Sequence, residues 1–354
     1  MAGAAPPPAE LDEPAHLSWV WRSLFEEGQV LTALLLSSTF SEKYRGRYMK
    51  ADSVAPIRVP GRCGEKTWHP TLLDRIGRRE AVAFVWRGDV ACDDRTLYVA
   101  FSPLRYRSQF VKVIAGGVVD KRRTAAFASS TDAQLGIPLA TYLKHKIDRM
   151  WGDNPTYNLC AMLLRHVETY PNHRVVFCGI SHGAALAQAA ALKFKDQQQS
   201  ADVFVITWNA YRWTDDSGSR AVERTFGYRF LPLVMSRRRG GTRSTRYWDS
   251  VAHFPDTLSA MPNVALLDAD TGGIIRHRDP SAGTRLGPLS LMRMLELHFA
   301  KGALSATRKA TELVINAWCA GDPPLQEGAE DLAARRSNGA AAPGGRDAAA
   351  FFTV

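Results

Sequence analysis

The chain has 354 residues, 45% hydrophobic and 23% charged, so it is long enough to bury a sizeable core and is not disordered throughout. Its net charge of +10 makes anionic partners plausible, including nucleic acid, acidic lipid head groups and phosphorylated substrates, but does not choose among them. The five cysteines are odd in number and scattered, without a CxxC pair or zinc-type spacing, which argues against a disulfide framework or a structural metal.

The two ends of the sequence differ in composition from the part between them. Residues 1–14 are rich in Pro and Ala and predict a flexible lead-in, and residues 321–354 are rich in Ala, Gly and charge and predict a disordered tail. We therefore expect the folded domain at 15–320. The absence of a secretory signal pattern and of an apolar run of roughly 18 residues favours an intracellular protein.

The first half of the folded part mixes helical and strand patterns. Residues 17–40 show the apolar spacing of an amphipathic helix buried against a core, with a membrane-surface helix as the alternative. The β-branched and aromatic runs 81–87 and 96–101 flank a turn with Gly and Asp, which predicts a hairpin. Residues 111–119 are a further candidate strand, and 139–150 with 158–170 predict helices.

The second half alternates strands with helices. Residues 175–178 predict a strand that leads into a helix from 184 to about 195, and 202–208 is an apolar run of the kind found in buried parallel strands. Further strands are predicted at 244–251 and 263–270, and helices at 289–299 and 305–319. This alternation predicts an α/β fold with a mostly parallel sheet flanked by helices.

The sequence Gly179-Ile180-Ser181-His182-Gly183 stands between a predicted strand and a predicted helix. A serine on such a turn exposes its Oγ and has the helix N-terminus aimed at the reaction centre, and the crowding of the turn favours glycine on both sides. Ser181 is therefore a candidate nucleophile, with a serine in an ordinary loop as the alternative.

A serine nucleophile needs a base and usually an orienting acid, which follow the serine in hydrolases with this turn. His182 would point along the helix and is a poor base, His277 lies among charges typical of a solvated turn, and His298 lies among apolar residues, as a core histidine also does. His253 is the remaining downstream histidine. Asp249 is the preferred acid because it follows a predicted strand, and the full set of candidates is Asp215, Asp216, Asp249, Asp256, Asp268 and Asp270.

The sequence resembles the class 3 (fungal-type) lipases, a branch of the α/β-hydrolase fold. Their elbow, G-H-S-L-G-G-A-L-A, is similar to GISHGAALA at 179–187. Their acid region, N-D-x-V-P-x-L-P, matches Asp249, Val251 and Pro255, and their histidine precedes an aromatic residue near the end of the domain, as His298 does. The resemblance covers about residues 80–300.

This resemblance implies a catalytic triad with Ser181 as nucleophile, Asp249 as orienting acid and His298 as general base. It implies a serine hydrolase that acts on lipid carboxylic esters through an acyl-enzyme. A lipid ester is the expected substrate, and the family needs no metal or organic cofactor.

The oxyanion strand departs from the family pattern. The family's strand ends in F-R-G-[ST], whereas here Phe101 is followed by Ser102, Pro103 and Leu104. The resemblance places the oxyanion donors at His182 and Leu104, without a hydroxyl at the latter. An alternative function follows from this departure: a catalytically impaired, lipase-like module that binds lipid or protein.

Two basic segments suggest further partners. In the family that this sequence resembles, the segment after the oxyanion strand forms a lid. Residues 105–117 here mix basic and apolar side chains, which suits an interface with the acidic head groups and acyl chains of an anionic membrane surface, with a buried strand as the alternative. The arginine-rich segment 236–248 predicts solvated surface first, then contact with anionic lipid. Nucleic acid is the least expected partner, because no aromatic residues are interleaved with these arginines before Tyr247.

Overall fold

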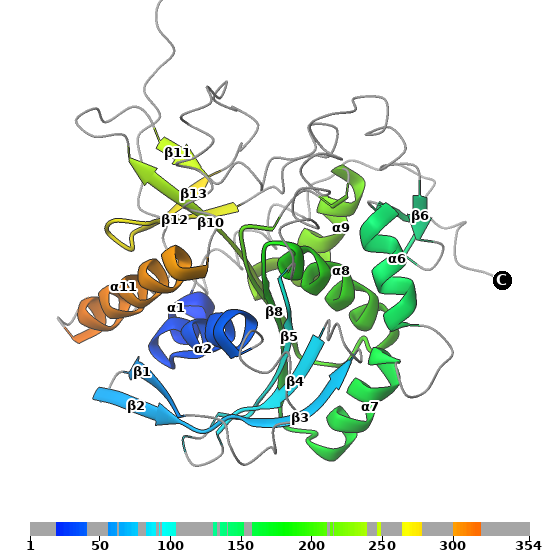
Figure 1. Cartoon of the computed structure of the whole chain (residues 1–354), viewed down its shortest axis with the longest axis horizontal. Helices are drawn as coiled ribbons and strands as arrows, with labels where there is room; N and C mark the ends of the chain where they lie inside the picture. The colour runs from blue at the N-terminus through cyan, green and yellow to red at the C-terminus, as the bar shows by residue number, and fades with distance from the viewer. Residues whose placement is uncertain are drawn as a thin grey trace, which may run out of the picture.

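A mixed sheet forms the centre of the molecule in the computed structural model (Figure 1). The sheet has nine strands in the order β13-β12-β10-β9-β8-β5-β4-β3, with β11 paired to β10. The structure describes residues 19–40, 56–61, 64–76, 83–89, 92, 94–103, 130–132, 135–139, 141–151, 158–210, 213–214, 216–238, 246–248, 264–277 and 300–319.

The inner strands of the sheet run parallel to one another, as predicted. They are β5 (Thr96–Phe101), β8 (Arg174–Ile180), β9 (Val203–Trp208), β10 (Phe230–Arg238) and β12 (Val264–Asp268). The antiparallel strands are β3 (Thr71–Ile76), β4 (Ala83–Arg87), β11 (Arg246–Trp248) and β13 (Ile274–His277). Two separate hairpins are formed by β1 (Ile57–Gly61) with β2 (Gly64–Trp68), and by β6 (Ser130–Asp132) with β7 (Ile137–Leu139).

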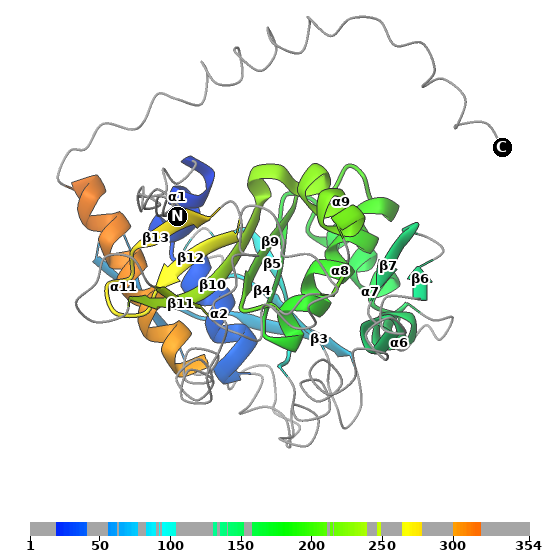
Figure 2. The same cartoon turned by 90° about the horizontal axis from the view of Figure 1, so that it is seen from above.

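Helices cover both faces of the sheet, which explains why its parallel strands are nearly continuous apolar runs. One face carries α6 (Thr141–Met150), α7 (Leu159–Thr169), α8 (His182–Gln197) and α9 (Asp216–Phe226). The other face carries α1 (Trp19–Glu26), α2 (Gln29–Leu35) and α11 (Ala300–Cys319) (Figure 2). Two single-turn elements are the π-helix Leu36–Phe40 and the 3-10 helix Gly227–Arg229. Among the described helices, none is both long and apolar enough to cross a membrane.

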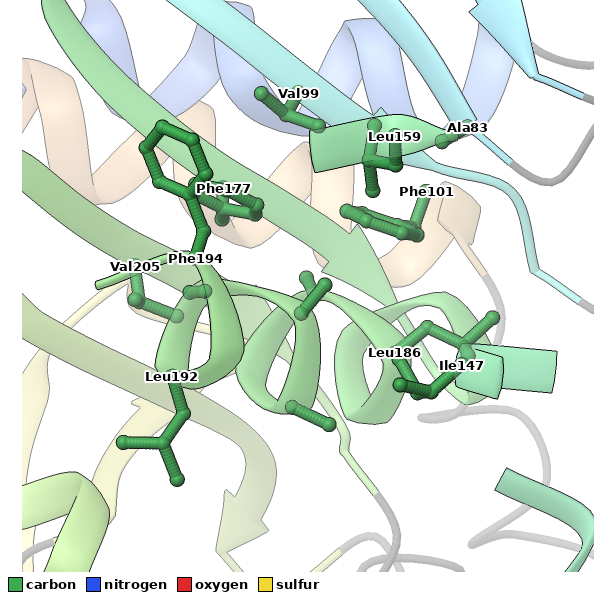
Figure 3. Packing of buried hydrophobic residues seen from close by; sticks show 14 of the residues in the cluster. Ala83, Val99, Phe101, Ile147, Leu159, Phe177, Leu186, Leu192, Phe194 and Val205 are labelled. Carbon is green, nitrogen blue, oxygen red and sulfur yellow. The ribbon is translucent and has the colours of Figure 1, made fainter. Parts of the chain in front are cut away.

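The alanine-rich helix α8 packs closely on β8 and so fixes its own N-terminus at the end of that strand. Phe177 on β8 stacks on Phe101 of β5 at 6.3 Å between ring centroids and contacts Phe194 of α8 at 5.7 Å. Leu186 extends this cluster toward α6 (Figure 3). Small alanine side chains along α8 allow this close approach, because they leave room for the aromatic rings.

The N-terminal segment forms two helices instead of the single predicted helix. Gly28 has φ 74° and separates α1 from α2, a conformation that glycine adopts at little cost. Every residue from Gln29 to Leu34 is buried, and α2 lies between the sheet and the helices α1 and α11. The prediction of burial against the core is confirmed, and the membrane-surface alternative is not, since α2 presents no open apolar face.

Most predicted elements in the described residues are confirmed. The hairpin of β4 and β5, the helices α6 and α7, the strands β8, β9 and β12, and the helix α11 lie where the patterns placed them. The prediction of a solvated turn at His277 is wrong, because this residue ends β13 and pairs with Val264. The strand and helix predicted at 111–119 and 289–299 lie outside the described residues, as do both termini.

Candidate active site

Ser181 occupies a tight turn between β8 and α8, as the sequence predicted. Its backbone has φ 57° and ψ −122°, a region that non-glycine residues adopt only when the surrounding structure imposes it. Its N–H donates to the carbonyl oxygen of Trp208 on β9 at 2.9 Å, and its own carbonyl accepts from Ala184 N–H at 3.0 Å. The turn is therefore held from the neighbouring strand and from the first turn of the helix.

The two glycines of this turn are required by close backbone contacts. A Cβ at Gly179 would lie 2.3 Å from the carbonyl oxygen of Gly183. A Cβ at Gly183 would lie 2.3 Å from the carbonyl oxygen of Phe101, the last residue of β5. The crowding inferred from the sequence is thus confirmed on both sides of Ser181, and the start of α8 lies directly against the end of β5.

The end of β5 brings an unusual polar group to this edge of the sheet. Ser102 is 7% exposed, and its Oγ is buried without a hydrogen-bond partner among the described residues. Pro103 follows and has no N–H to donate. Leu104, the second predicted oxyanion donor, lies outside the described residues.

His182 begins α8 with its side chain buried at 4% exposure. Burial, with a smaller contribution from the charge of Lys146, lowers the pKa of His182 to about 3. The imidazole is therefore neutral at physiological pH. Its backbone N–H lies at the helix N-terminus, where the dipole favours negative charge.

β10 and β11 precede Asp249, the predicted acid, in the sequence. Ser236 of β10 pairs with Asp268 of β12 and also with Trp248 of β11, so these two strands lie on opposite sides of β10. β11 therefore lies on the β9 side, beyond the end of β9, and runs back toward the level of the Ser181 turn. Asp249 is the next residue after β11, and both it and His298 lie outside the described residues.

Two other residues that the sequence offered for the triad do not fit it: Asp268 bonds the turn that follows its own strand, and His277 lies too far from Ser181. Asp268 accepts three hydrogen bonds at Oδ1, from Asp270 N–H and from the N–H and hydroxyl of Thr271, and so closes the turn after β12. His277 ends β13, four strands from β8, which at ~4.8 Å per strand is about 19 Å. That separation exceeds the reach of an imidazole toward Ser181. His253, Asp215 and Asp256 lie outside the described residues.

Sequence reasoning missed two buried polar groups beside the turn. Gln188 of α8 donates to the Thr207 hydroxyl of β9 at 2.8 Å and accepts from the Trp213 indole at 2.6 Å. Asn209 follows β9 with φ 52° and is fully buried. A polar Asn directly after a fully buried, mostly apolar strand is the signal that marks this position. Among the described residues, no cluster of His, Cys, Asp or Glu is arranged to hold a metal ion.

Comparison with known proteins identifies the region around the turn. Residues 83–237 match the family described as lipase (class 3). The fold is similar to the LIP2 lipase of Yarrowia lipolytica, with a TM-score of 0.54 and 14% identity over 81% of this chain and 95% of that one. It is also similar to a mutant form of MDLA from Penicillium cyclopium, with a TM-score of 0.54 and 13% identity over 83% of this chain and 99% of that one.

Identity at this level carries the fold alone, and no curated protein matches the sequence. The family match extends from β4 to β10 and includes the turn with its two glycines. Residues 83–237 are therefore similar to the class 3 lipase family, and the chain has the fold of the α/β-hydrolases.

Proposed function

We propose that this protein is a serine hydrolase of lipid carboxylic esters, with Ser181 as nucleophile, His298 as general base and Asp249 as the acid that orients it. The observation that carries the proposal is the conformation of Ser181. A left-handed serine is held on a strand-to-helix turn inside a class 3 lipase region. Holding a serine in this conformation costs stability, and catalysis is a reason to maintain it.

The proposed reaction proceeds through an acyl-enzyme. Ser181 Oγ attacks the ester carbonyl carbon while His298 accepts the hydroxyl proton, and the resulting oxyanion is stabilised by the His182 backbone N–H and the α8 N-terminus. When the intermediate collapses, the ester bond breaks and the leaving alcohol takes the proton from His298. Water then attacks the acyl-enzyme with His298 as base, which releases the fatty acid and restores Ser181.

The neutral state of His182 makes the pH dependence of this reaction informative. Because the pKa of His182 is about 3, its imidazole does not titrate near neutral pH. A rate that falls as pH is lowered, with an apparent pKa near ~6.5, therefore does not report His182. His298 is the residue that the proposal assigns to that transition.

A second candidate function is a lipase-like module that binds lipid or protein without catalysis. It is favoured by the end of β5, where Pro103 has no N–H and the buried Ser102 hydroxyl has no partner among the described residues. A binding module would keep the fold and the turn while losing the oxyanion donors on which turnover depends.

Labelling with a fluorophosphonate separates these functions, because the probe modifies only an activated serine. We expect covalent modification at Ser181, abolished in Ser181→Ala and reduced by at least about 1,000-fold in His298→Ala. Ser219→Ala is the matched control. Ser219 is buried in α9, 2% exposed, and in this variant Ser181 should label at the wild-type rate. A folded wild-type protein that does not react would contradict the hydrolase and leave the binding module.

The substrate class needs a second measurement. We expect release of fatty acid from an emulsified triacylglycerol as well as turnover of a short soluble ester. Activity on the soluble ester alone would retain the serine hydrolase and reject a lipid ester as its substrate.

A further inference from the structure

Asn209 lies one residue beyond β9 and is buried against the sheet with 0% exposure. Its φ of 52° makes it, with Ser181, one of two non-glycine residues with positive φ in the described part of the chain. Asn tolerates this left-handed conformation better than most residues. The two residues in this conformation are neighbours, because Trp208, the residue before Asn209, pairs with Ile180, the residue before Ser181.

Asn209 makes two hydrogen bonds to β10. Its N–H donates to the carbonyl oxygen of Leu233 at 2.8 Å, and its side-chain Oδ1 accepts from the N–H of Met235 at 2.8 Å. The left-handed backbone thus turns the chain away from β10, while the side chain reaches the next free backbone group along that strand.

These two bonds fill a gap along one edge of β10. β9 pairs with β10 as far as Leu233, and β11 pairs with the same edge from Ser236 onward. Asn209 bonds the Leu233 carbonyl and the Met235 N–H between these two partners, and so links the part of the edge paired with β9 to the part paired with β11. A side chain therefore takes the place of a strand residue at this point.

Asn209 lies between the Ser181 turn and β11, the strand that directly precedes Asp249. On one side, Ser181 N–H donates to the carbonyl oxygen of Trp208, directly before Asn209. On the other, β11 ends at Trp248, directly before Asp249. Three backbone and side-chain bonds therefore connect the nucleophile turn to the strand on which the β11 hairpin is built.

We infer that Asn209 is a positioning residue: it fixes the register of β10 and β11 against the Ser181 turn, and β11 leads directly into Asp249, the proposed acid. The inference rests on the proposed hydrolase function. Both of the bonds from Asn209 to β10 are made to backbone groups, so loss of its side chain should slow the reaction of Ser181 while Ser181 remains the labelled residue.

The test measures the rate of fluorophosphonate labelling in variants at this position. Asn209→Gly keeps the left-handed backbone and removes the Oδ1 bond, and we expect it to label about 100-fold more slowly, the usual cost of a displaced catalytic group. Asn209→Asp keeps an Oδ1 acceptor for Met235 N–H and should restore most of the rate. Asn209→Ser, whose side chain is too short to reach Met235, replaces the glycine variant if that protein does not fold.

A double-mutant comparison distinguishes positioning from a general loss of stability. In an Asp249→Asn background, Asn209→Gly should cause little further loss of rate, because its effect passes through Asp249. Leu163→Ala, a buried change in α7, is the destabilising control and should leave the labelling rate near wild type.

Three outcomes would overturn the inference. If wild type and Asn209→Gly label at equal rates, Asn209 is not a positioning residue, while the proposed hydrolase function stands. If the losses of labelling rate from Asn209→Gly and Asp249→Asn add in the double variant, Asn209 does not act through Asp249. A folded wild-type protein without labelling would reject the hydrolase and this inference together.

Discussion

At the residue scale, the turn at Ser181 shows how neighbouring elements hold a serine at positive φ. The serine is held by Trp208 from β9 and by the first residues of α8, while Gly179 and Gly183 allow three backbones to meet. Neither glycine has positive φ, so neither is needed for its conformational freedom. Both are needed because a Cβ would collide with a carbonyl group.

Gly183→Ala should disable the turn. The added Cβ would lie 2.3 Å from the Phe101 carbonyl oxygen, so either α8 or β5 must move. We expect loss of fluorophosphonate labelling and a free energy of unfolding lower by about 1–3 kcal/mol in urea titrations. Gly273→Ala is the matched control, because its Cβ would meet only the Thr271 hydroxyl at 3.3 Å. Unchanged labelling in Gly183→Ala would show that the contact relaxes without affecting Ser181.

At the scale of elements, the buried helix α2 is the clearest example of packing that overrides local pattern. Its seven residues are too few to be stable alone, since isolated helices below ~12 residues are marginal in water. Tertiary contacts from the sheet, α1 and α11 therefore supply its stability.

Truncation of a buried side chain on α2 should be costly. Leu31 is 0% exposed, and Leu31→Ala is expected to lower the free energy of unfolding by about 2–5 kcal/mol. Leu313 on α11 is 49% exposed, so Leu313→Ala should change stability by less than about 0.5 kcal/mol. Chemical denaturation of both variants measures the difference. Equal, small effects would mean that α2 is not part of the cooperative core.

The elements that could be predicted from the sequence have a strong local pattern, and those that were missed do not. β8, β9 and α8 are strongly patterned and were predicted. β10 was missed because Pro232 lies within it, and proline is rare in central strands. The role of Asn209 was hidden because it depends on Met235, 26 positions away, and no local pattern carries such a contact.

At the scale of the whole molecule, two buried titratable groups have opposite effects on how stability depends on pH. Burial raises the pKa of Asp94 to about 7, although hydrogen bonds from Tyr98 and Gln29 favour its charged form. Burial lowers the pKa of His182 to about 3. Asp94 therefore binds a proton on folding, whereas His182 loses one.

The two linkages have opposite signs in the same pH range. The folded pKa of Asp94 is raised, so its contribution to stability is complete below its unfolded pKa of 3.8 and is lost as pH rises to about 7. The folded pKa of His182 is lowered, so its contribution is complete above 6.5 and is lost as pH falls toward 3. Each changes the free energy of unfolding by about 1.4 kcal/mol per pH unit between pH 4 and 6.5, and in the wild type they cancel.

Single substitutions should expose each linkage. Relative to wild type, His182→Leu should lose about 2 kcal/mol of stability when pH rises from 4.5 to 6.0, and Asp94→Asn should gain about 2 kcal/mol over the same interval. Urea unfolding at the two pH values measures both differences. Parallel pH profiles in all three proteins would show that neither group changes protonation on folding.

The position of α11 has a consequence for the order in which the protein is made. This helix packs over α1 and α2, Thr307 accepts the indole N–H of Trp208 at 3.1 Å, and Arg308 reaches the Arg58 carbonyl 250 positions away. At ~5–20 residues per second, α11 leaves the ribosome on the order of ten seconds to a minute after α2. During that interval α2 has no contact with α11, so its apolar surface on that side stays uncovered until the last described helix is synthesised.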